Sequence, residues 1–564
     1  MENRKFGMSG FWLLVIPLIF MGVFYFFPLG KLVSLSFSQA NSTLNKAVNW
    51  QIIGGAAGFT FFQAGLSTIL TVLLGLPAAY IFGRFNFPGK NALRIASTLP
   101  FILPTVVVAA GFNALIGPKG WLNLALMGIL GTSEPSINIQ NTLAAILMAH
   151  VFYNTSIVIR VVGSALAQFD RKLEYAAQTL GASPWKTFIK ITVPLLLPSI
   201  LSAVLLVFLF DFTSFGVILM MGGPRFTTLE VEIYIQTMQF LNLPLAGLLS
   251  LIQLGFTMVV TFLLMKMGDG GIGVPVMPRL QQEGLRDPVK GWEKAFTFVV
   301  VLLLLLLLIS PIVSLVIRSF SVKAPAINGG TGEKMHWSLS YYRELFINRQ
   351  RSLFYVPPIK AVWNSLKFAG TSALISLSLG IMLAYGLLSS KNLRAVNLLM
   401  MLPLGTSAVT LGLGFFTAFS GGAGSLGWVG LLIPLAHALI SLPFVLRVVQ
   451  PALQSIPASL KLAAQCLGAK PLDVWRFVEL PIIWRALMTA AVFAFTISLG
   501  EFGATSFLSR PDMPTMPIAI FRYLNQPGSS NYGQAMAMAV IILFVCIVSM
   551  AFLDRLQFNL KSGT

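Results

Sequence analysis

Long apolar runs recur along the whole of this 564-residue chain, and they restrict its fold more than any other feature. Residues 296–317, for example, include no charged side chain, and about 20 apolar residues in a helix are enough to cross a lipid bilayer. Hydrophobic residues make up 56% of the chain and charged residues only 10%, which leaves too little polar surface to enclose the apolar side chains in water. The sequence therefore excludes a water-soluble fold and predicts an all-α polytopic membrane protein surrounded by the lipid bilayer.

Twelve of these runs are long enough to be membrane spans. The first is too long for a cleaved signal peptide and lacks an Ala-x-Ala site, so we expect it to remain as a membrane helix. The twelve transmembrane helices are expected near residues 11–35, 56–83, 95–117, 141–166, 195–221, 245–266, 296–318, 362–388, 395–420, 427–449, 484–508 and 535–555.

Basic residues cluster in the short loops that lie on one side of a chain with twelve spans. These residues are Arg4 and Lys5; Arg84, Lys90 and Arg94; Lys391 and Arg394; and Arg555 with Lys561. By the positive-inside rule this side is the cytoplasm, so we expect both termini to be cytoplasmic. The same flanking residues explain the formal net charge of +20, because they are not gathered with aromatic residues on one face, as a nucleic-acid site requires.

An internal repeat relates the two halves of the chain. Many residues recur as the same type 287 positions later, including His150 and His437, Arg160 and Arg447, Gly181 and Gly468, and Pro194 and Pro481. A repeat of six spans brings each copy back in the same orientation, so the halves are expected to be parallel repeats around a central path. We expect the first repeat over residues 1–267, a cytoplasmic linker over 268–294 and the second repeat over 295–564.

One repeated stretch follows the fourth span of each half. It covers residues 171–194, with Leu-Glu-Tyr-Ala-Ala-Gln-Thr-Leu-Gly at 173–181, and residues 458–481, with Leu-Lys-Leu-Ala-Ala-Gln-Cys-Leu-Gly at 460–468. In both copies the glycine precedes a proline by 13 residues. This pattern predicts a short helix with a small-residue face, a glycine turn at its end, and a second short helix begun near a proline. We expect the first helix to protrude as a docking knob.

This stretch resembles the EAA loop of the membrane subunits of ATP-binding-cassette importers, in which Glu-Ala-Ala is followed by three residues, a Gly and later a Leu-Pro-like end. The matching residues are Ala176, Ala177, Gly181 and Pro194 in the first copy and Ala463, Ala464, Gly468 and Pro481 in the second. The resemblance covers nearly the whole chain, because the motif occurs once in each half.

Both copies depart from the family pattern at the glutamate. Tyr175 and Leu462 occupy its place, and the nearest charged residues, Glu174 and Lys461, lie one position earlier and have opposite signs. The helical shape is expected to be intact, whereas a salt bridge made by the family's glutamate does not carry over.

The resemblance implies a type I ABC importer permease fold in a bacterial inner membrane, with both halves fused as in the thiamine and ferric-iron branch. It further implies two copies of a separate ATPase subunit, which receive the two coupling loops, and an extracytoplasmic solute-binding protein. We expect no catalytic residue, cofactor, metal or nucleic-acid partner in the chain itself. The nearest approach to a Walker loop, residues 83–90, is one residue too long and is followed by Asn91 instead of Ser or Thr.

Two stretches bear on the solute. Residues 150–154, His-Val-Phe-Tyr-Asn, and the segment 222–234 look like the thiamine permease, although ferric-iron permeases have a similar Thr-Thr-Leu segment. The sequence therefore favours thiamine or a related cationic pyrimidine, with ferric iron next, and leaves a polyamine, a phosphonate or another anion open.

Two carboxylates, Asp211 and Glu501, lie late in the fifth span of their half. Charged groups inside a membrane are costly, and by default they indicate a functional site. We expect both carboxylates to face the central path, where an acidic lining would favour a cation, together with Thr213, Ser214, Ser498 and Thr505. The alternative is that each is a structural carboxylate bonded to a neighbouring helix.

The histidines His150 and His437 occupy matching places in the fourth spans. Neither has a His, Cys or carboxylate three or four residues later, so a hydrogen bond between helices is favoured over a metal site.

Two other classes of protein are alternatives. An ion-gradient-driven secondary transporter with two six-helix halves also has parallel repeats, but residues 83–90 lack its usual basic motif after the second span. A polytopic membrane enzyme needs clustered His, Asp or Ser side chains, and the chain has only 3 histidines. The sequence therefore favours the permease of an ATP-driven importer.

Overall fold

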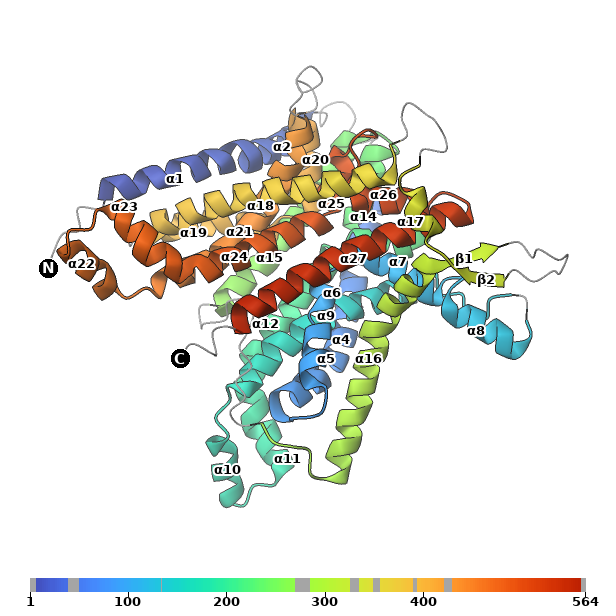
Figure 1. Ribbon diagram of the computed structural model, residues 1–564, viewed down its shortest axis with the longest axis horizontal. Helices are drawn as coiled ribbons and strands as arrows, with labels where there is room; N and C mark the ends of the chain where they lie inside the picture. Colours follow the sequence, from blue (N-terminus) through green and yellow to red (C-terminus); the bar gives the residue numbers. More distant parts are fainter. Residues whose placement is uncertain are drawn as a thin grey trace. The chain divides into compact units, whose positions relative to one another are not determined.

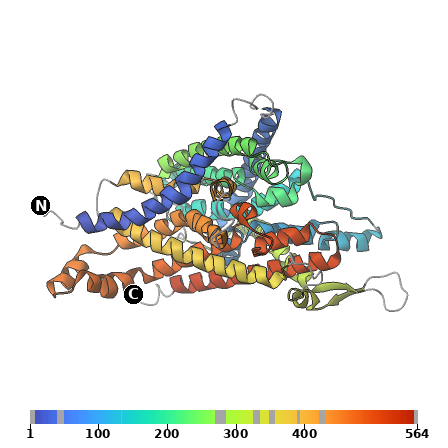
Figure 2. The same cartoon turned by 90° about the horizontal axis from the view of Figure 1, so that it is seen from above.

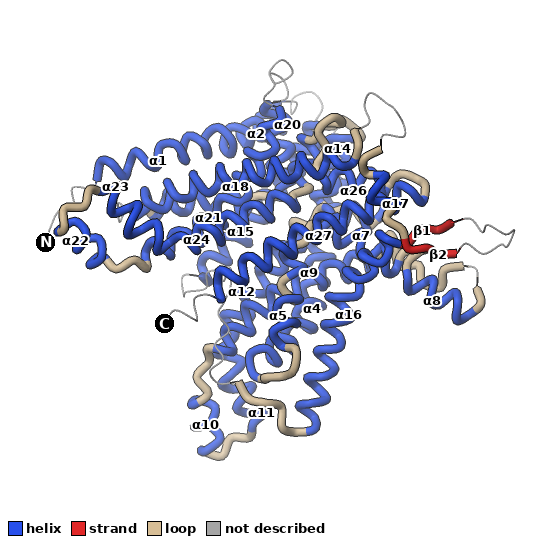
Figure 3. Tube along the Cα trace, in the orientation of Figure 1, coloured by secondary structure: helices blue, strands red, loops and turns tan. Residues whose placement is uncertain are grey.

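The computed structural model describes residues 7–38, 50–132, 134–268, 285–324, 334–347, 356–388, 393–419 and 429–558. Nearly all of them are helical, as Figure 3 shows. The one sheet among the described residues is an antiparallel hairpin of β1 (Ser321–Ala324) and β2 (Lys334–Trp337). It extends from the end of α16 (Gly291–Phe320), as Figures 1 and 2 show. The predicted all-helical class is therefore confirmed, with this small hairpin added.

The chain packs as two compact units. The first-repeat unit comprises the described residues within 50–231 and 256–338, and the second-repeat unit comprises those within 1–49, 232–255 and 339–564. Two helices, α14 (Leu229–Met238) and α15 (Leu243–Gly268), contribute residues to both units.

Besides α16 and the hairpin, the first-repeat unit contains the elements of one EAA-like loop and the spans around it. These are α4 (Trp50–Arg84), α5 (Lys90–Ala96), α6 (Leu99–Ile102), α7 (Thr105–Ile116), α8 (Trp121–Leu130), α9 (Leu143–Ala167), α10 (Lys172–Thr179), α11 (Pro184–Thr187), a π-helical turn (Phe188–Thr192), α12 (Val193–Phe212), α13 (Gly216–Met221) and a 3₁₀ turn (Gly223–Arg225).

The second-repeat unit has a corresponding set. Its elements are α1 (Gly7–Met21), a π-helical turn (Gly22–Phe26), α2 (Phe27–Ser38), α17 (Ser340–Glu344), α18 (Pro358–Leu388), α19 (Arg394–Met401), a 3₁₀ turn (Leu402–Gly405), α20 (Ala408–Phe419), α21 (Val429–Gln454), α22 (Ala458–Cys466), α23 (Pro471–Val474), a π-helical turn (Trp475–Glu479), α24 (Leu480–Gly500), α25 (Gly503–Leu508), α26 (Met516–Leu524) and α27 (Ser529–Phe558).

The first helices of the two repeats are exchanged between the units. In the second-repeat unit α1 packs along α18 and α2 along α20, whereas in the first-repeat unit α16 packs along α7 (Figure 1). The π-helical turn between α1 and α2 places the Tyr25 hydroxyl 2.7 Å from that of Thr406. The predicted limits of the repeats rest on sequence similarity and stay a prediction, and most of the predicted linker, residues 269–284, lies outside the described residues.

Among the described residues, 10 helices are long and apolar enough to cross a membrane, and a bent pair over Ala395–Phe419 would make 11. The third predicted span, near 95–117, is broken into α6 and α7. Leu103 is extended there (ψ 135°), because the ring of Pro104 disfavours a helical conformation in the residue before it. A similar break at Thr406 bends the pair over Ala395–Phe419 by 97°.

Glycines let the long helices of each unit approach closely. A Cβ atom at Gly75 of α4 would lie 2.6 Å from Cβ of Val158 in α9, and one at Gly380 of α18 would lie 2.5 Å from Cγ1 of Val445 in α21. Val158 and Val445 are 287 positions apart, so the same helix contact recurs in both repeats. These contacts fix α9 and α21, the helices that carry the two histidines.

Candidate functional site

The first EAA-like loop, residues 171–194, folds as two short helices joined by a glycine turn. At the end of α10 the N–H groups of Gly181 and Ala182 donate to the carbonyl oxygens of Gln178 and Ala177, each at 3.0 Å. Gly181 has a φ of +89°, a left-handed conformation that residues with a Cβ atom rarely adopt. α11 and a π-helical turn follow, and they lead directly into α12.

The second EAA-like loop, residues 458–481, has the same conformation. Gly468 has a φ of +86°, and its N–H donates to the carbonyl of Gln465 at 2.9 Å, while that of Ala469 donates to the carbonyl of Ala464 at 3.0 Å. The predicted order of short helix, glycine turn and second short helix is confirmed in both loops. Figure 1 shows α10 with α11, and α22 with α23, each at one end of its own unit.

We call α10 and α22 the knob helices, because neither contains a buried residue. Leu180 and Leu467, the matching residues before each glycine, are both 89% exposed. Of the predicted loop residues, Tyr175, Ala176, Gly181, Pro194, Leu462, Ala463, Gly468 and Pro481 are exposed, whereas Glu174, Ala177, Lys461 and Ala464 are half-buried. The knob helices therefore present small and apolar side chains that the chain itself leaves uncovered, as a contact surface for another protein does.

A carboxylate ties the first knob helix to its unit. Glu174 of α10 forms an ion pair with Arg84 at the end of α4, and the same carboxylate oxygen accepts a hydrogen bond from the Thr192 hydroxyl at 2.5 Å. Arg84 is buried and Glu174 is largely so, since their side chains are 7% and 15% exposed. We call this contact the first strut: it joins the knob helix to the end of α4 and to the π-helical turn before α12.

The second knob helix is tied in the same way with the charges exchanged. Lys461 of α22 forms an ion pair with Glu479 at 2.5 Å, and Glu479 accepts a hydrogen bond from the Tyr385 hydroxyl of α18 at 2.5 Å. This contact is the second strut. The sequence provided no support for a salt bridge in these loops, because the family's glutamate is missing. The structure nevertheless contains a salt bridge in each loop.

The end of the linker is fastened beside the first EAA-like loop. The Arg286 guanidinium donates two hydrogen bonds to Glu293, at 2.6 and 2.9 Å, and these raise its pKa. The backbone of Arg286 pairs with the loop after α4, donating to the Arg84 carbonyl and accepting from the Asn86 N–H. Its guanidinium also lies 5.0 Å from the centre of the Phe85 ring.

In the first repeat, His150 of α9 contacts two of the predicted solute-path residues. Its Nδ1 lies 3.4 Å from Oδ1 of Asp211, and its Nε2 lies 2.8 Å from the Ser214 hydroxyl. The Asn154 amide donates to the same Asp211 oxygen at 2.6 Å, and the Gln63 amide donates to the Asp211 backbone carbonyl at 2.8 Å. Asp211 is fully buried.

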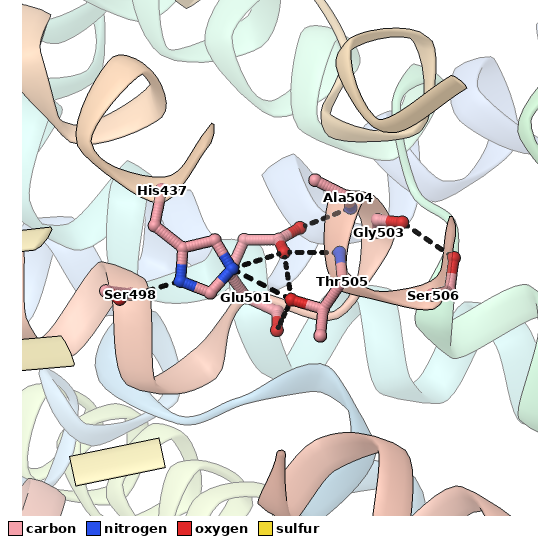
Figure 4. A network of polar contacts seen from close by, with 7 residues as sticks. All are labelled: His437, Ser498, Glu501, Gly503, Ala504, Thr505 and Ser506. Atoms are coloured by element: carbon pink, nitrogen blue, oxygen red, sulfur yellow. Dashed lines mark hydrogen bonds and ion pairs between the residues drawn. The ribbon is translucent and has the colours of Figure 1, made fainter. Parts of the chain in front are cut away.

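In the second repeat, His437 of α21 holds a corresponding group, drawn in Figure 4. Its Nδ1 lies 2.7 Å from the Ser498 hydroxyl, and its Nε2 lies 3.1 Å from Glu501 and 2.8 Å from the Thr505 hydroxyl. Glu501 also accepts hydrogen bonds from the backbone N–H groups of Ala504 and Thr505, at 2.8 and 3.0 Å. Both of its oxygens therefore cap the start of α25.

The two histidine groups differ by one exchange. Asp211 and Ser498 are 287 positions apart, as are Ser214 and Glu501, so the carboxylate and the hydroxyl have changed places around an equivalent histidine. Each group lies where the fifth span of its half breaks. Thr213, the remaining predicted path residue, donates its hydroxyl to the Leu209 carbonyl of its own helix at 2.9 Å.

Five of the six predicted path residues thus gather around the two histidines, which make hydrogen bonds between helices as predicted. Sequence reasoning missed Gln63 and Asn154, although Asn154 lies four residues after His150 and hence on the same helix face. Within the described residues, no group of three His, Cys, Asp or Glu side chains is placed to hold a metal ion. That the two carboxylates, Asp211 and Glu501, line the solute path stays a prediction.

Comparison with known proteins places these features in a family. Residues 71–322 and 376–562 match the family described as the binding-protein-dependent transport system inner membrane component. The thiamine transport system permease protein of Escherichia coli is 27% identical over 511 residues, which cover 88% of each chain. The corresponding protein of Brucella abortus is 26% identical over 550 residues (95% of this chain and 93% of the relative), and a probable ABC transporter permease protein of Sinorhizobium fredii is 24% identical over 536 residues (92% and 90%).

Proposed function

We propose that this chain, which belongs to the family of binding-protein-dependent transport system inner membrane components, carries thiamine or a related organic cation across the membrane. The chain is a multi-pass inner-membrane permease of an ABC importer and a distant relative of thiamine permeases. Its family implies an ATPase and a binding protein as partners. The permease component is not itself catalytic, and this family assignment leaves the ion-gradient alternative without support.

The observation that carries the proposal is the pair of knob helices. The residue directly after each knob helix, Leu180 or Leu467, is apolar and 89% exposed. Exposed leucines next to small residues are expected to be covered by a partner. We infer that two copies of the ATPase subunit cover them, one on each knob helix, with the knob helices and both termini in the cytoplasm.

The solute preference rests on relatives and on charge. The thiamine permeases match this chain over about nine-tenths of its length, whereas the ferric-iron alternative gains no support from them. Asp211 is the better placed of the two carboxylates to meet a cation. Its Oδ2 has no hydrogen bond among the described residues, although Ser67 lies beside the carboxylate, while both oxygens of Glu501 are occupied.

Reconstitution tests the proposed solute. The chain would be placed in liposomes with its ATPase and solute-binding protein, and ATP hydrolysis would be measured with thiamine, ferric iron or putrescine. Stimulation by thiamine alone is the expected result. Stimulation by ferric iron alone would refute thiamine as the solute. Transport without any ATPase would refute the assignment to an ATP-driven importer.

Variants of the carboxylates test the solute path. Ser506→Ala is a matched control, because the Ser506 hydroxyl donates to the Gly503 carbonyl of its own helix, at 2.6 Å. We expect Asp211→Asn to lower thiamine uptake more than Glu501→Gln does, and the control to leave it unchanged. Unaltered uptake after both carboxylates are replaced would show that neither faces the solute.

A further inference from the structure

The knob helices have no buried side chains of their own that would hold them against the spans. α10 has 8 residues and α22 has 9, and neither buries any of them. Isolated helices shorter than about 12 residues are marginally stable in water. The two struts are the charged contacts described above that tie each knob helix to neighbouring spans, through Glu174 and Lys461.

The struts join the same elements in both repeats while the chemistry differs. Glu174 and Lys461 are 287 positions apart, and so are Thr192 and Glu479. In the first repeat the carboxylate belongs to the knob helix, and in the second it belongs to the π-helical turn. In both repeats this carboxylate also bonds a residue near the end of a long helix, Arg84 of α4 or Tyr385 of α18. The bridge is therefore present in both repeats, although different positions carry its charges.

We propose that Glu174 and Glu479 are positioning residues, which fix each knob helix to the spans so that its displacement is passed to them. This inference rests on the proposed function, because it concerns how movement of an ATPase would reach the membrane helices. A single buried carboxylate suits the role, since charge-assisted hydrogen bonds are short and directional and hold their partners in one geometry.

The chain offers matched reporter positions. Cys466, at the end of α22, is an exposed free cysteine, whereas Cys546 is buried. The repeat partner of Cys466 is Thr179, at the end of α10. A nitroxide attached to Cys466 therefore reports the mobility of the second knob helix. In a variant with Thr179→Cys and Cys466→Ser, a nitroxide attached at position 179 would report the mobility of the first.

Mobility of the two labels would be read from the spin-resonance line shape of the full chain in nanodiscs. We expect Glu174→Gln to raise the mobile fraction at position 179 on the order of tenfold and to leave position 466 unchanged, and Glu479→Gln to do the reverse. Equal changes at both labels, or no change at either label, would refute the proposal.

Moving the charges of the second strut into the first repeat tests whether the bridge itself, and not the identity of one residue, holds the knob helix in place. The double variant Glu174→Lys with Thr192→Glu gives the first repeat the charges of the second, with Arg84 as an additional partner for the new carboxylate. We expect this variant to restore the low mobility that Glu174→Lys alone loses. Failure of the rescue, in a variant whose thermal stability is unchanged, would overturn the proposed role of the bridge.

The complex with the ATPase distinguishes this inference from the proposed function. We expect Glu174→Gln to retain the ATPase on purification and to lose most of the hydrolysis stimulated by thiamine-loaded binding protein. If the unaltered chain fails to bind any ATPase, the proposed function fails. If the variant binds and is stimulated like the unaltered chain, only the role of the strut fails.

Discussion

The glycine turns of the EAA-like loops give a prediction that depends on backbone conformation alone. At Gly181 and Gly468 φ is +89° and +86°, and an added Cβ atom would have no other atom within 4 Å. Side-chain size is therefore not the obstacle to substitution. A left-handed conformation costs an ordinary residue about 1–2 kcal/mol relative to glycine, and asparagine tolerates it better than alanine does.

This cost should appear in binding of the ATPase subunit. If the docked knob requires the glycine turn, about 1–2 kcal/mol corresponds to a loss of roughly 5 to 30-fold in affinity. We expect affinity at position 181 to fall in the order Gly, Asn, Ala, Val, because β-branched residues avoid positive φ most strongly. The same order is expected at position 468.

Affinity would be measured by titrating the ATPase onto the permease in nanodiscs. Gly370→Ala is the matched control, because Gly370 also has no atom within 4 Å of an added Cβ but lies inside helix α18. Alanine is favourable there by up to about 1 kcal/mol. An affinity that follows side-chain size, with Asn as harmful as Val, would refute the reasoning from φ, and so would unchanged binding in every variant.

Three further predictions follow from single contacts. Gly75→Ala should destabilise the chain by about 1–3 kcal/mol, because its Cβ atom would lie 2.6 Å from Cβ of Val158. An unchanged melting temperature in detergent would contradict this close contact. Glu501→Ala should cost about 3 kcal/mol or more, since it leaves buried N–H donors unpaired, against about 1 kcal/mol for Ser506→Ala; equal melting temperatures would contradict this. Burial lowers the pKa of Lys90 to about 8, so its methylated amine should titrate near pH 8 by NMR. Stability should rise as the pH increases from about 8 to the usual lysine pKa, because over this range the unfolded chain still binds the proton. A titration midpoint near 10.5 would show that the Lys90 amine is not buried.

Patterns that depend on local chemistry were predictable from the sequence. Apolar runs locate most of the spans, because a helix in lipid must be apolar over a fixed length. The glycine turns at Gly181 and Gly468 follow from glycine's freedom at positive φ. The repeat spacing of 287 placed the equivalent loops and histidines at matching positions.

Features that depend on contacts between distant residues were not predictable. The break in the predicted span near 95–117 is an exception: we missed it although its cause is local, since Pro104 disfavours a helical conformation in the residue before it. The ion pair between Glu174 and Arg84 joins residues 90 positions apart, and no local sequence pattern predicts it. The exchange of the first helices between the units is likewise set by packing rather than by the hydrophobicity of α1 or α16.

If the two knob helices face the cytoplasm and are covered by an ATPase, as we propose, the end of α22 should be accessible from that side of the membrane alone. Cys466 tests it directly, because this thiol is exposed at the end of α22 while Cys546 is buried. We predict that a membrane-impermeant maleimide labels Cys466 in inside-out vesicles but not in intact cells, and that a bound ATPase subunit blocks the labelling. Labelling from the outside would show that the second knob helix is not cytoplasmic, and unchanged labelling in the presence of a saturating ATPase would show that the ATPase does not cover it.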